Sequence, residues 1–246
     1  MSFSVFQTMR GFMPHDAARL TYRLVRPDRF GEFEDMHATP PSEHTNISFI
    51  PLQETRSNFV HVPKAAGASV GRALYGCHTG HHMNLLDYRT AFTKMFFDAA
   101  FKFTFVRNPW DRLVSAYFYL RQDTGLAFNR AQAEKSVTQF DTFEDFVTDF
   151  MARKDFNSIL HLREQHLFLR LPWRGIGVDF VGRYESLHDD FAFIAKRLDR
   201  DIALEHRNAS ALRKHDYRDL YTPACIDIVS RAYAKDIEYF GYRFEG

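Results

Sequence analysis

The first residues that could carry chemistry stand together in one short loop. Small side chains let an anion approach the backbone N–H groups at the start of a helix, where these donors have no intrahelical partner and the helix dipole adds positive potential. A lysine adds a mobile charge and a serine adds a hydroxyl donor. The loop consists of Lys64, Ala65, Ala66, Gly67, Ala68 and Ser69. This pattern predicts a phosphate-binding loop, although similar turns also occur in α/β folds for packing alone.

The order of these residues separates the loop from the common nucleotide loop, G-x-x-x-x-G-K-[ST]. In that motif the lysine follows the glycines and the hydroxyl binds Mg²⁺, whereas Lys64 comes first here. A metal-dependent phosphotransferase also needs an acidic residue near the end of another strand. The second strand expected in this chain ends in Arg107 instead. The sequence therefore favours transfer from an anionic donor without a metal.

Arg107 and Ser115 predict a second anion site. Ser115 lies seven residues after Asn108, about two helical turns along. It therefore faces the same side as the start of the helix that Arg107 precedes. A guanidinium group together with a hydroxyl suits a phosphate. The alternative is that Arg107 pairs with Asp111 and that Ser115 only fills space.

Three histidines follow the loop within a few residues: His78, His81 and His82. Histidine is suited to removing a proton near neutral pH, so one of them could activate a hydroxyl acceptor. The same cluster could equally bind a metal or belong to the surface.

Strands that alternate with helices would position these residues. Asn108 followed by Pro109 is a strong helix start. The alternation predicts an α/β fold with a central, mainly parallel sheet flanked by helices, and residues 1–55 are expected to be irregular and to wrap around it. Strands are predicted at 58–62, 102–107 and 178–183, and helices at 67–75, 108–121, 141–154, 186–198 and 222–239.

Composition limits the classes of protein that remain. The chain has 246 residues, a net charge of +1 and 26 phenylalanines, so it can build a large core and its overall charge gives no argument for a nucleic-acid partner. Cys77 and Cys225 form neither a disulfide framework nor a metal-ligand spacing. No signal-peptide core and no apolar stretch of membrane-spanning length are visible. We expect a cytoplasmic protein with no integral membrane segment, either monomeric or a homo-oligomer.

Two segments in order, HVPKAAGASV at 61–70 and FTFVRNPWDRLVSAYFYLR at 103–121, resemble the carbohydrate branch of the sulfotransferases that use 3′-phosphoadenosine 5′-phosphosulfate (PAPS). The segments 178–191 and 217–244 are similar to further parts of that family. The resemblance covers most of the chain from about residue 57 and is weak over 122–177. Within the branch, the chain resembles the uronyl and heparan 2-O-sulfotransferases.

The resemblance implies a P-loop-like three-layer fold and roles for the two anion sites. Residues Lys64 to Ser69 would hold the 5′-phosphosulfate, and Arg107 and Ser115 the 3′-phosphate. A single domain over 1–246 would divide into an N-terminal wrap (1–55), a PAPS-binding core (56–121), an acceptor-side insertion (122–177) and the C-terminal part of the core (178–246).

Further residues take roles only through the resemblance. His82 falls where some uronyl 2-O-sulfotransferases carry the catalytic base, with His81 as the reserve. The basic segment 206–218 has a family counterpart that forms a loop over the nucleotide. Its candidate donor-binding residues are Ser210, Arg213 and Lys214.

A groove for the acceptor is expected from the segment 161–175, where Glu164 stands in place of a proline that the family often carries. The candidate residues for lining it are His161, Arg163 and Trp173, although a solvated helix face fits them equally well.

The sequence therefore predicts a PAPS-dependent sulfotransferase that leaves 3′-phosphoadenosine 5′-phosphate (PAP) as its product and requires no metal. Its acceptor would be a hydroxyl on a carbohydrate, either a glycan or a glycolipid. Because no anchor is visible, a bacterial cytoplasmic enzyme is expected. The alternatives are a P-loop-type nucleotide or small-molecule kinase and a non-catalytic module that binds a nucleotide or a glycan.

Overall fold

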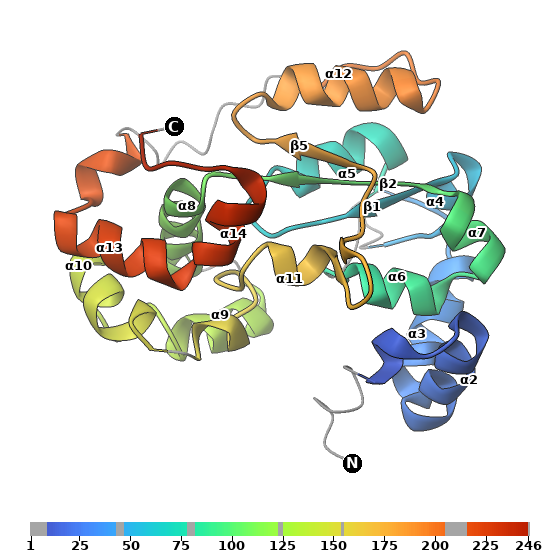
Figure 1. The fold of residues 1–246 in the computed structure, drawn as a ribbon, viewed down its shortest axis with the longest axis horizontal. Coiled ribbons are helices and arrows are strands. Elements are labelled where there is room, and N and C mark those ends of the chain that lie inside the picture. Colours follow the sequence, from blue (N-terminus) through green and yellow to red (C-terminus); the bar gives the residue numbers. More distant parts are fainter. Residues whose placement is uncertain are drawn as a thin grey trace. The chain divides into compact units, whose positions relative to one another are not determined.

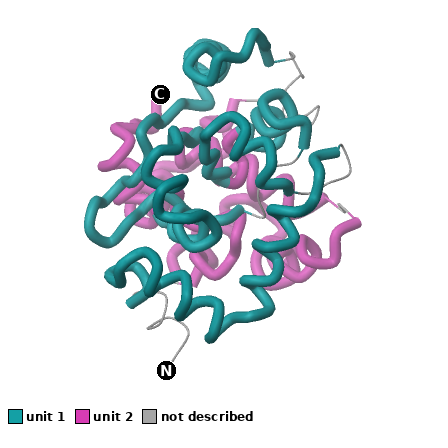
Figure 2. Tube along the Cα trace, turned by 90° about the vertical axis from the view of Figure 1, so that its right-hand side faces the viewer, with its two compact units in different colours: residues 1–62, 66–105, 167–205 teal, residues 63–65, 106–166, 206–246 magenta. Residues whose placement is uncertain are grey.

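The computed structural model of the protein describes residues 9–42, 47–77, 82–122, 125–153, 155–204 and 216–245 (Figure 1). The chain divides into two compact units, shown in two colours in Figure 2. Unit 1 consists of residues 1–62, 66–105 and 167–205, and unit 2 of residues 63–65, 106–166 and 206–246. The single domain expected over residues 1–246 remains a prediction.

Unit 1 contains a sheet of three strands in the order β1 (Ser57–Val60), β2 (Phe101–Val106) and β5 (Phe180–Arg183). β1 and β2 run parallel, with Ser57 opposite Phe101 and Val60 opposite Thr104. Figure 1 shows α5 (Gly67–Tyr75) and α12 (Leu187–Arg197) on one side of the sheet and α6 (Leu85–Ala91) on the other. The predicted α/β fold with a parallel sheet flanked by helices is confirmed.

The remaining elements of unit 1 are two N-terminal helices of 11 and 12 residues and several shorter helices and strands. β3 (Arg170–Leu171) and β4 (Gly175–Ile176) form a separate antiparallel pair. His166, the first residue of α11 (His166–Leu169), belongs to unit 2. These elements are α2 (His15–Val25), α3 (Pro27–Ala38), α4 (Ile50–Glu54), α7 (Lys94–Ala99), α11 (His166–Leu169), β3 (Arg170–Leu171) and β4 (Gly175–Ile176).

The N-terminal segment differs from the prediction. Residues 1–55 are expected from the sequence to be irregular, but α2, α3 and α4 lie within them. Ala18 and Tyr22 on α2, and Phe30 and Phe33 on α3, are buried. Their spacing of three or four residues places them on one face of each helix. This apolar period is a helix signal, but many polar residues interrupt it in the sequence.

Unit 2 is helical in its described part. In place of the helix predicted over 141–154, the structure has a short α-helix that starts at Phe143 and continues as a π-helix to Met151. The helix predicted over 222–239 is divided into two helices at Tyr233. None of the described helices combines the length and the apolar composition that a membrane span requires. The elements are α8 (Pro109–Arg121), α9 (Ala127–Glu134), α10 (Phe143–Asp145), a π-helix (Phe146–Met151), 3₁₀ turns (Phe156–Ser158 and Tyr217–Leu220), α13 (Pro223–Ala232) and α14 (Ala234–Phe240).

Phenylalanine builds the core of each unit, as the composition predicts. In unit 1, Phe59 and Phe103 on neighbouring strands stack with ring centroids 5.1 Å apart. In unit 2, Phe146 and Phe150 stack at 5.6 Å. Stacked aromatic pairs contribute about 0.5–1.5 kcal/mol beyond the burial of their surface. The stacked pair Phe59–Phe103 favours the observed register of β1 against β2.

Candidate anion-binding and catalytic site

The predicted phosphate loop has an unusual backbone. The chain leaves β1 at Val60 and enters α5 at Gly67, and between them Lys64 (φ +66°) and Ala66 (φ +65°) adopt the left-handed conformation. This conformation is costly for a residue with a Cβ atom and persists only where the surroundings enforce it. Left-handed residues in a turn can direct successive N–H groups towards one side, where they make a concave anion-binding surface. The backbone geometry thus fits the predicted function of the loop.

Strained residues are concentrated among the predicted site residues. Five described residues other than glycine have a positive φ, and three of them are Lys64, Ala66 and His82. Backbone strain of this kind clusters at ligand-binding and catalytic positions in proteins.

The first turn of α5 is not capped by a side chain within the described part of the chain. Ala66 is the N-cap residue, and its carbonyl oxygen accepts from the N–H groups of Ser69 (3.0 Å) and Val70 (3.1 Å). Ala68 is exposed and Ser69 is half-buried. The uncapped N-terminus therefore offers backbone donors and a hydroxyl group to an anion.

Gly67 is required by a close contact in unit 1. A Cβ atom at this position would lie 1.8 Å from Cδ2 and 2.0 Å from Nε2 of His61. Real Cβ atoms do not approach other atoms so closely, so only glycine fits at the start of α5 while this ring keeps its position. His61 is not among the site residues predicted from the sequence.

Lys64 is half-buried in unit 2, where its Nζ lies 3.8 Å from the centroid of the Tyr119 ring. The hydroxyl of Tyr119 accepts a hydrogen bond from Nδ2 of Asn129 (2.9 Å), which fixes the ring. Burial and, as the smaller cause, the positive charge of Arg107 together lower the pKa of Lys64 to about 8. An anion bound beside Lys64 would oppose both effects and favour the protonated amine.

Arg107 connects Lys64 with Asp111 of α8 within unit 2. It is buried, its Nη1 donates to the carbonyl oxygen of Lys64 (3.1 Å), and its Nε donates to Oδ2 of Asp111 (2.8 Å). The ion pair with Asp111, left open as an alternative by the sequence, is present. It does not replace the contact with the loop, because separate guanidinium nitrogens make the two hydrogen bonds. Ser115 follows on α8 and is half-buried.

A side-chain amide holds the backbone of Arg107. The backbone N–H of Arg107 donates to Oε1 of Gln165 (3.0 Å), and Nε2 of Gln165 donates to the backbone carbonyl oxygen of Arg107 (2.8 Å). The N–H groups of Gln165 (2.7 Å) and His166 (2.8 Å) donate to the fully buried carboxylate of Asp236. These residues position Arg107, and no local sequence pattern indicated them.

His82 is half-buried beside the end of β1 in unit 1. Its Nδ1 lies 3.3 Å from the carbonyl oxygen of His61, and the two rings are 4.4 Å apart. Asn84 starts α6 two residues later with a capping box that it shares with Asp87, and Arg10 forms an ion pair with Asp87 (2.9 Å). The start of α6 therefore fixes the segment that carries His82.

Several predicted residues lie outside the described part of the chain, and others belong to different units. The residues described contain no group of three or more His, Cys, Asp or Glu side chains that could hold a metal ion. Of the acceptor-groove candidates, His161 is buried with its ring 5.0 Å from that of Tyr119 in unit 2, whereas the exposed Trp173 belongs to unit 1. The predicted residues His78, His81, Ser210, Arg213 and Lys214 lie outside the described part of the chain.

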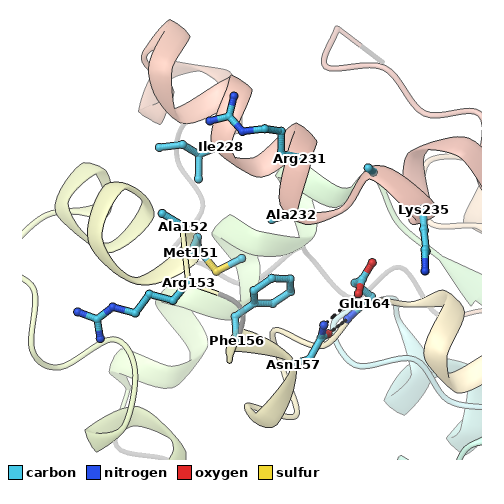
Figure 3. A pocket seen from close by; sticks show the side chains of 11 residues that line it. Met151, Ala152, Arg153, Phe156, Asn157, Glu164, Ile228, Arg231, Ala232 and Lys235 are labelled. Carbon is cyan, nitrogen blue, oxygen red and sulfur yellow. Dashed lines mark hydrogen bonds between the residues drawn. The ribbon is translucent and has the colours of Figure 1, made fainter.

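A pocket of about 540 Å³ opens in unit 2 (Figure 3). Glu164, on its wall, accepts a hydrogen bond from Nδ2 of Asn157 (2.9 Å). None of the donor-site candidates that the structure describes lines this pocket, but much of its wall comes from the segment 122–177. The lining residues are Met151, Ala152, Arg153, Phe156, Asn157, Glu164, Ile228, Arg231, Ala232, Ala234 and Lys235.

A comparison with protein families gives a match to the model described as "Sulfotransferase family" over residues 54–243. The matched segment begins just before β1 and includes the loop, Arg107, Ser115 and His82. In a comparison with curated proteins, no sequence matches the chain.

Proposed function

This chain belongs to the sulfotransferase family, and on that premise we propose that it transfers the sulfuryl group of PAPS to a hydroxyl of a carbohydrate. The observation that carries the proposal is the loop from Lys64 to Ser69. Its strained backbone and uncapped helix start form an anion cradle, and the guanidinium of Arg107 is hydrogen-bonded to the loop itself. The P-loop-like character of the fold is part of this proposal.

The donor would be bound through its two charged ends. Lys64, Ala65, Ala66, Gly67, Ala68 and Ser69 would bind the 5′-phosphosulfate, because backbone N–H groups, a hydroxyl and an ammonium group complement a compact anion. Arg107 and Ser115 would bind the 3′-phosphate. Ser210, Arg213 and Lys214, in the basic segment of the sequence, would add contacts to the nucleotide.

The reaction needs charge stabilisation and a base. The acceptor oxygen attacks sulfur, the bond from sulfur to the bridging oxygen breaks, and PAP leaves with the electron pair of that bond. Lys64 would stabilise the negative charge that grows on the bridging oxygen. His82 would take the proton of the acceptor hydroxyl, with His81 as the alternative base. The products are PAP, the sulfated acceptor and a protonated histidine that later releases its proton to water.

The acceptor side is assigned to the segment 122–177, which resembles the family least. The pocket of Figure 3 draws much of its wall from this segment, and three cationic side chains, Arg153, Arg231 and Lys235, stand on it beside one carboxylate, Glu164. This balance favours an acidic sugar over a neutral one. We place the enzyme in the cytoplasm of a bacterium as part of the same proposal.

Ligand-induced stabilisation tests the donor. PAP should raise the melting temperature, whereas ATP with Mg²⁺ should not. In this loop the lysine comes before the glycine, and Arg107 occupies the position where a kinase needs an acidic residue to bind the metal. A ligand at 100 times its Kd adds about 2.7 kcal/mol of stability, which differential scanning fluorimetry detects easily. A larger shift with ATP and Mg²⁺ would instead favour the kinase alternative.

Arg107→Ala is expected to weaken PAP binding far more than binding of adenosine 5′-monophosphate, which lacks the 3′-phosphate. The lost charge-assisted hydrogen bond is worth about 1.5–3 kcal/mol, roughly 10- to 150-fold in Kd. Isothermal titration calorimetry with both nucleotides measures the difference. Because Arg107 is buried against Asp111, Ser115→Ala serves as a milder second variant, and the exposed Arg72→Ala serves as the control. Equal losses for both nucleotides would show that Arg107 does not bind the 3′-phosphate.

A further inference from the structure

We infer that His61 is a positioning residue that couples the phosphate loop to His82. The inference rests on the proposed function for its catalytic consequence. Its geometry lies entirely within unit 1, where the His61 ring contacts both the start of α5 and the ring of His82.

The first contact fixes the His61 ring against the loop. His61 follows β1 directly, and its ring is stacked at 6.0 Å and 10° on that of Phe59, a fully buried residue of the strand. The same ring occupies the space in which a side chain on Gly67 would stand, with Cγ only 2.4 Å from the position of a Cβ atom. The ring therefore contacts both a strand residue and the first residue of α5. Any shift of this helix start must move the ring, and the converse also holds.

The second contact joins the same residue to the proposed base. The rings of His61 and His82 are 4.4 Å apart at 54°, and Nδ1 of His82 lies 3.3 Å from the His61 carbonyl oxygen. A carbonyl oxygen can only accept a hydrogen bond, so Nδ1 of His82 must carry the hydrogen. In the neutral ring the lone pair is then on Nε2. This arrangement selects Nε2 of His82 as the atom that removes the acceptor proton.

The backbone of His82 indicates why such support is needed. Its φ of +50° is unfavourable for a residue with a side chain, so local preference does not hold the imidazole in place. The capping box of α6 fixes the chain on its C-terminal side, and His61 fixes the ring itself. Because His61 also contacts Gly67, the position of the base depends on the position of the donor loop.

A double-mutant cycle tests this coupling. Alone, His61→Ala should reduce kcat roughly 10- to 100-fold, with a smaller effect on the KM for the acceptor. In the background of His82→Ala the same substitution should reduce kcat less than threefold, because a positioning residue has no effect once its target is absent. Additive losses would show that His61 does not act through His82. The control is His37→Ala, also in unit 1, whose ring packs against Phe49 (4.9 Å) and Phe92 (5.0 Å), and which should leave the His82→Ala effect unchanged.

Two readouts need no turnover and therefore separate this inference from the proposed function. Gly67→Ala should lower the melting temperature, and adding His61→Ala should restore part of it, because removal of the ring leaves room for the new methyl group.

In ¹⁵N spectra of histidine-labelled protein, neutral His82 should carry its hydrogen on Nδ1. The inference fails if the double variant is no more stable than Gly67→Ala alone, or if His82 carries its hydrogen on Nε2. If both readouts succeed but PAPS and every sugar acceptor give no turnover, only the proposed function fails.

Discussion

Replacing Lys64 by alanine is expected to reduce sulfuryl transfer by roughly 10²–10³-fold in kcat, the usual cost of removing one preorganised donor from a developing negative charge. The same variant should bind PAP more weakly, by about 1.5–3 kcal/mol, because the amine contacts the donor in the ground state as well. Single-turnover kinetics with PAPS and calorimetry with PAP measure the two losses. Unchanged PAP affinity together with normal turnover would remove Lys64 from the site.

The pH dependence of PAP binding gives Lys64 a second signature. Burial and the charge of Arg107 lower its pKa to about 8, so the free protein loses the positive charge as the pH rises through that value. A bound anion favours the protonated amine and raises its pKa. PAP affinity should therefore fall as the pH rises above about 8. In Lys64→Arg this decline should disappear, because a guanidinium group stays protonated, whereas persistence of the decline would assign it to another group.

His82→Ala is expected to lose turnover without losing PAP affinity, in contrast to Lys64→Ala. A general base contributes typically 10²–10⁴-fold in rate, so kcat should fall on that scale while PAP affinity stays near that of the native protein. The acid limb of the pH–rate profile should change as well, because protonation of a histidine base removes the lone pair that accepts the acceptor proton. Transfer assays across pH, with PAP titrations in parallel, check both expectations.

Three other outcomes for His82→Ala are informative. Substantial remaining activity would place the base elsewhere, and His81→Ala would be the next variant to measure. Loss of PAP binding would indicate that His82 supports the donor loop instead. A large drop in melting temperature would indicate that its contact with His61 is mainly structural.

Lys64 also contacts an aromatic ring within unit 2. Nζ of Lys64 lies over the Tyr119 ring, and a cation over an aromatic face contributes about 0.5–2 kcal/mol. Contact of the amine with the bridging oxygen would have to compete with this interaction. The ring thus holds the amine in a defined place within unit 2, rather than leaving a flexible chain in solvent.

Local sequence determined the positions of the first two strands of the sheet and of the loop and helix between them. The β-formers of 58–62 and 102–107 and the small residues after Lys64 predicted a strand, a loop and a helix where β1, the loop and α5 are found. Such signals can be read from sequence because each depends on residues only a few positions apart. The N-terminal helices were missed because their apolar period is interrupted by many polar residues.

Only the tertiary structure decided what surrounds the site residues. Arg107 receives its backbone partner from Gln165, 58 residues later, and the His61 carbonyl meets a ring 21 residues away. The lowered pKa of Lys64 likewise results from burial beside Arg107, 43 residues along the chain. Local sequence specifies which groups are available, but their contacts and proton affinities depend on how distant segments pack. For that reason the sequence alone predicted an anion-binding loop, and only the packed structure assigned His61 a position between that loop and the proposed base.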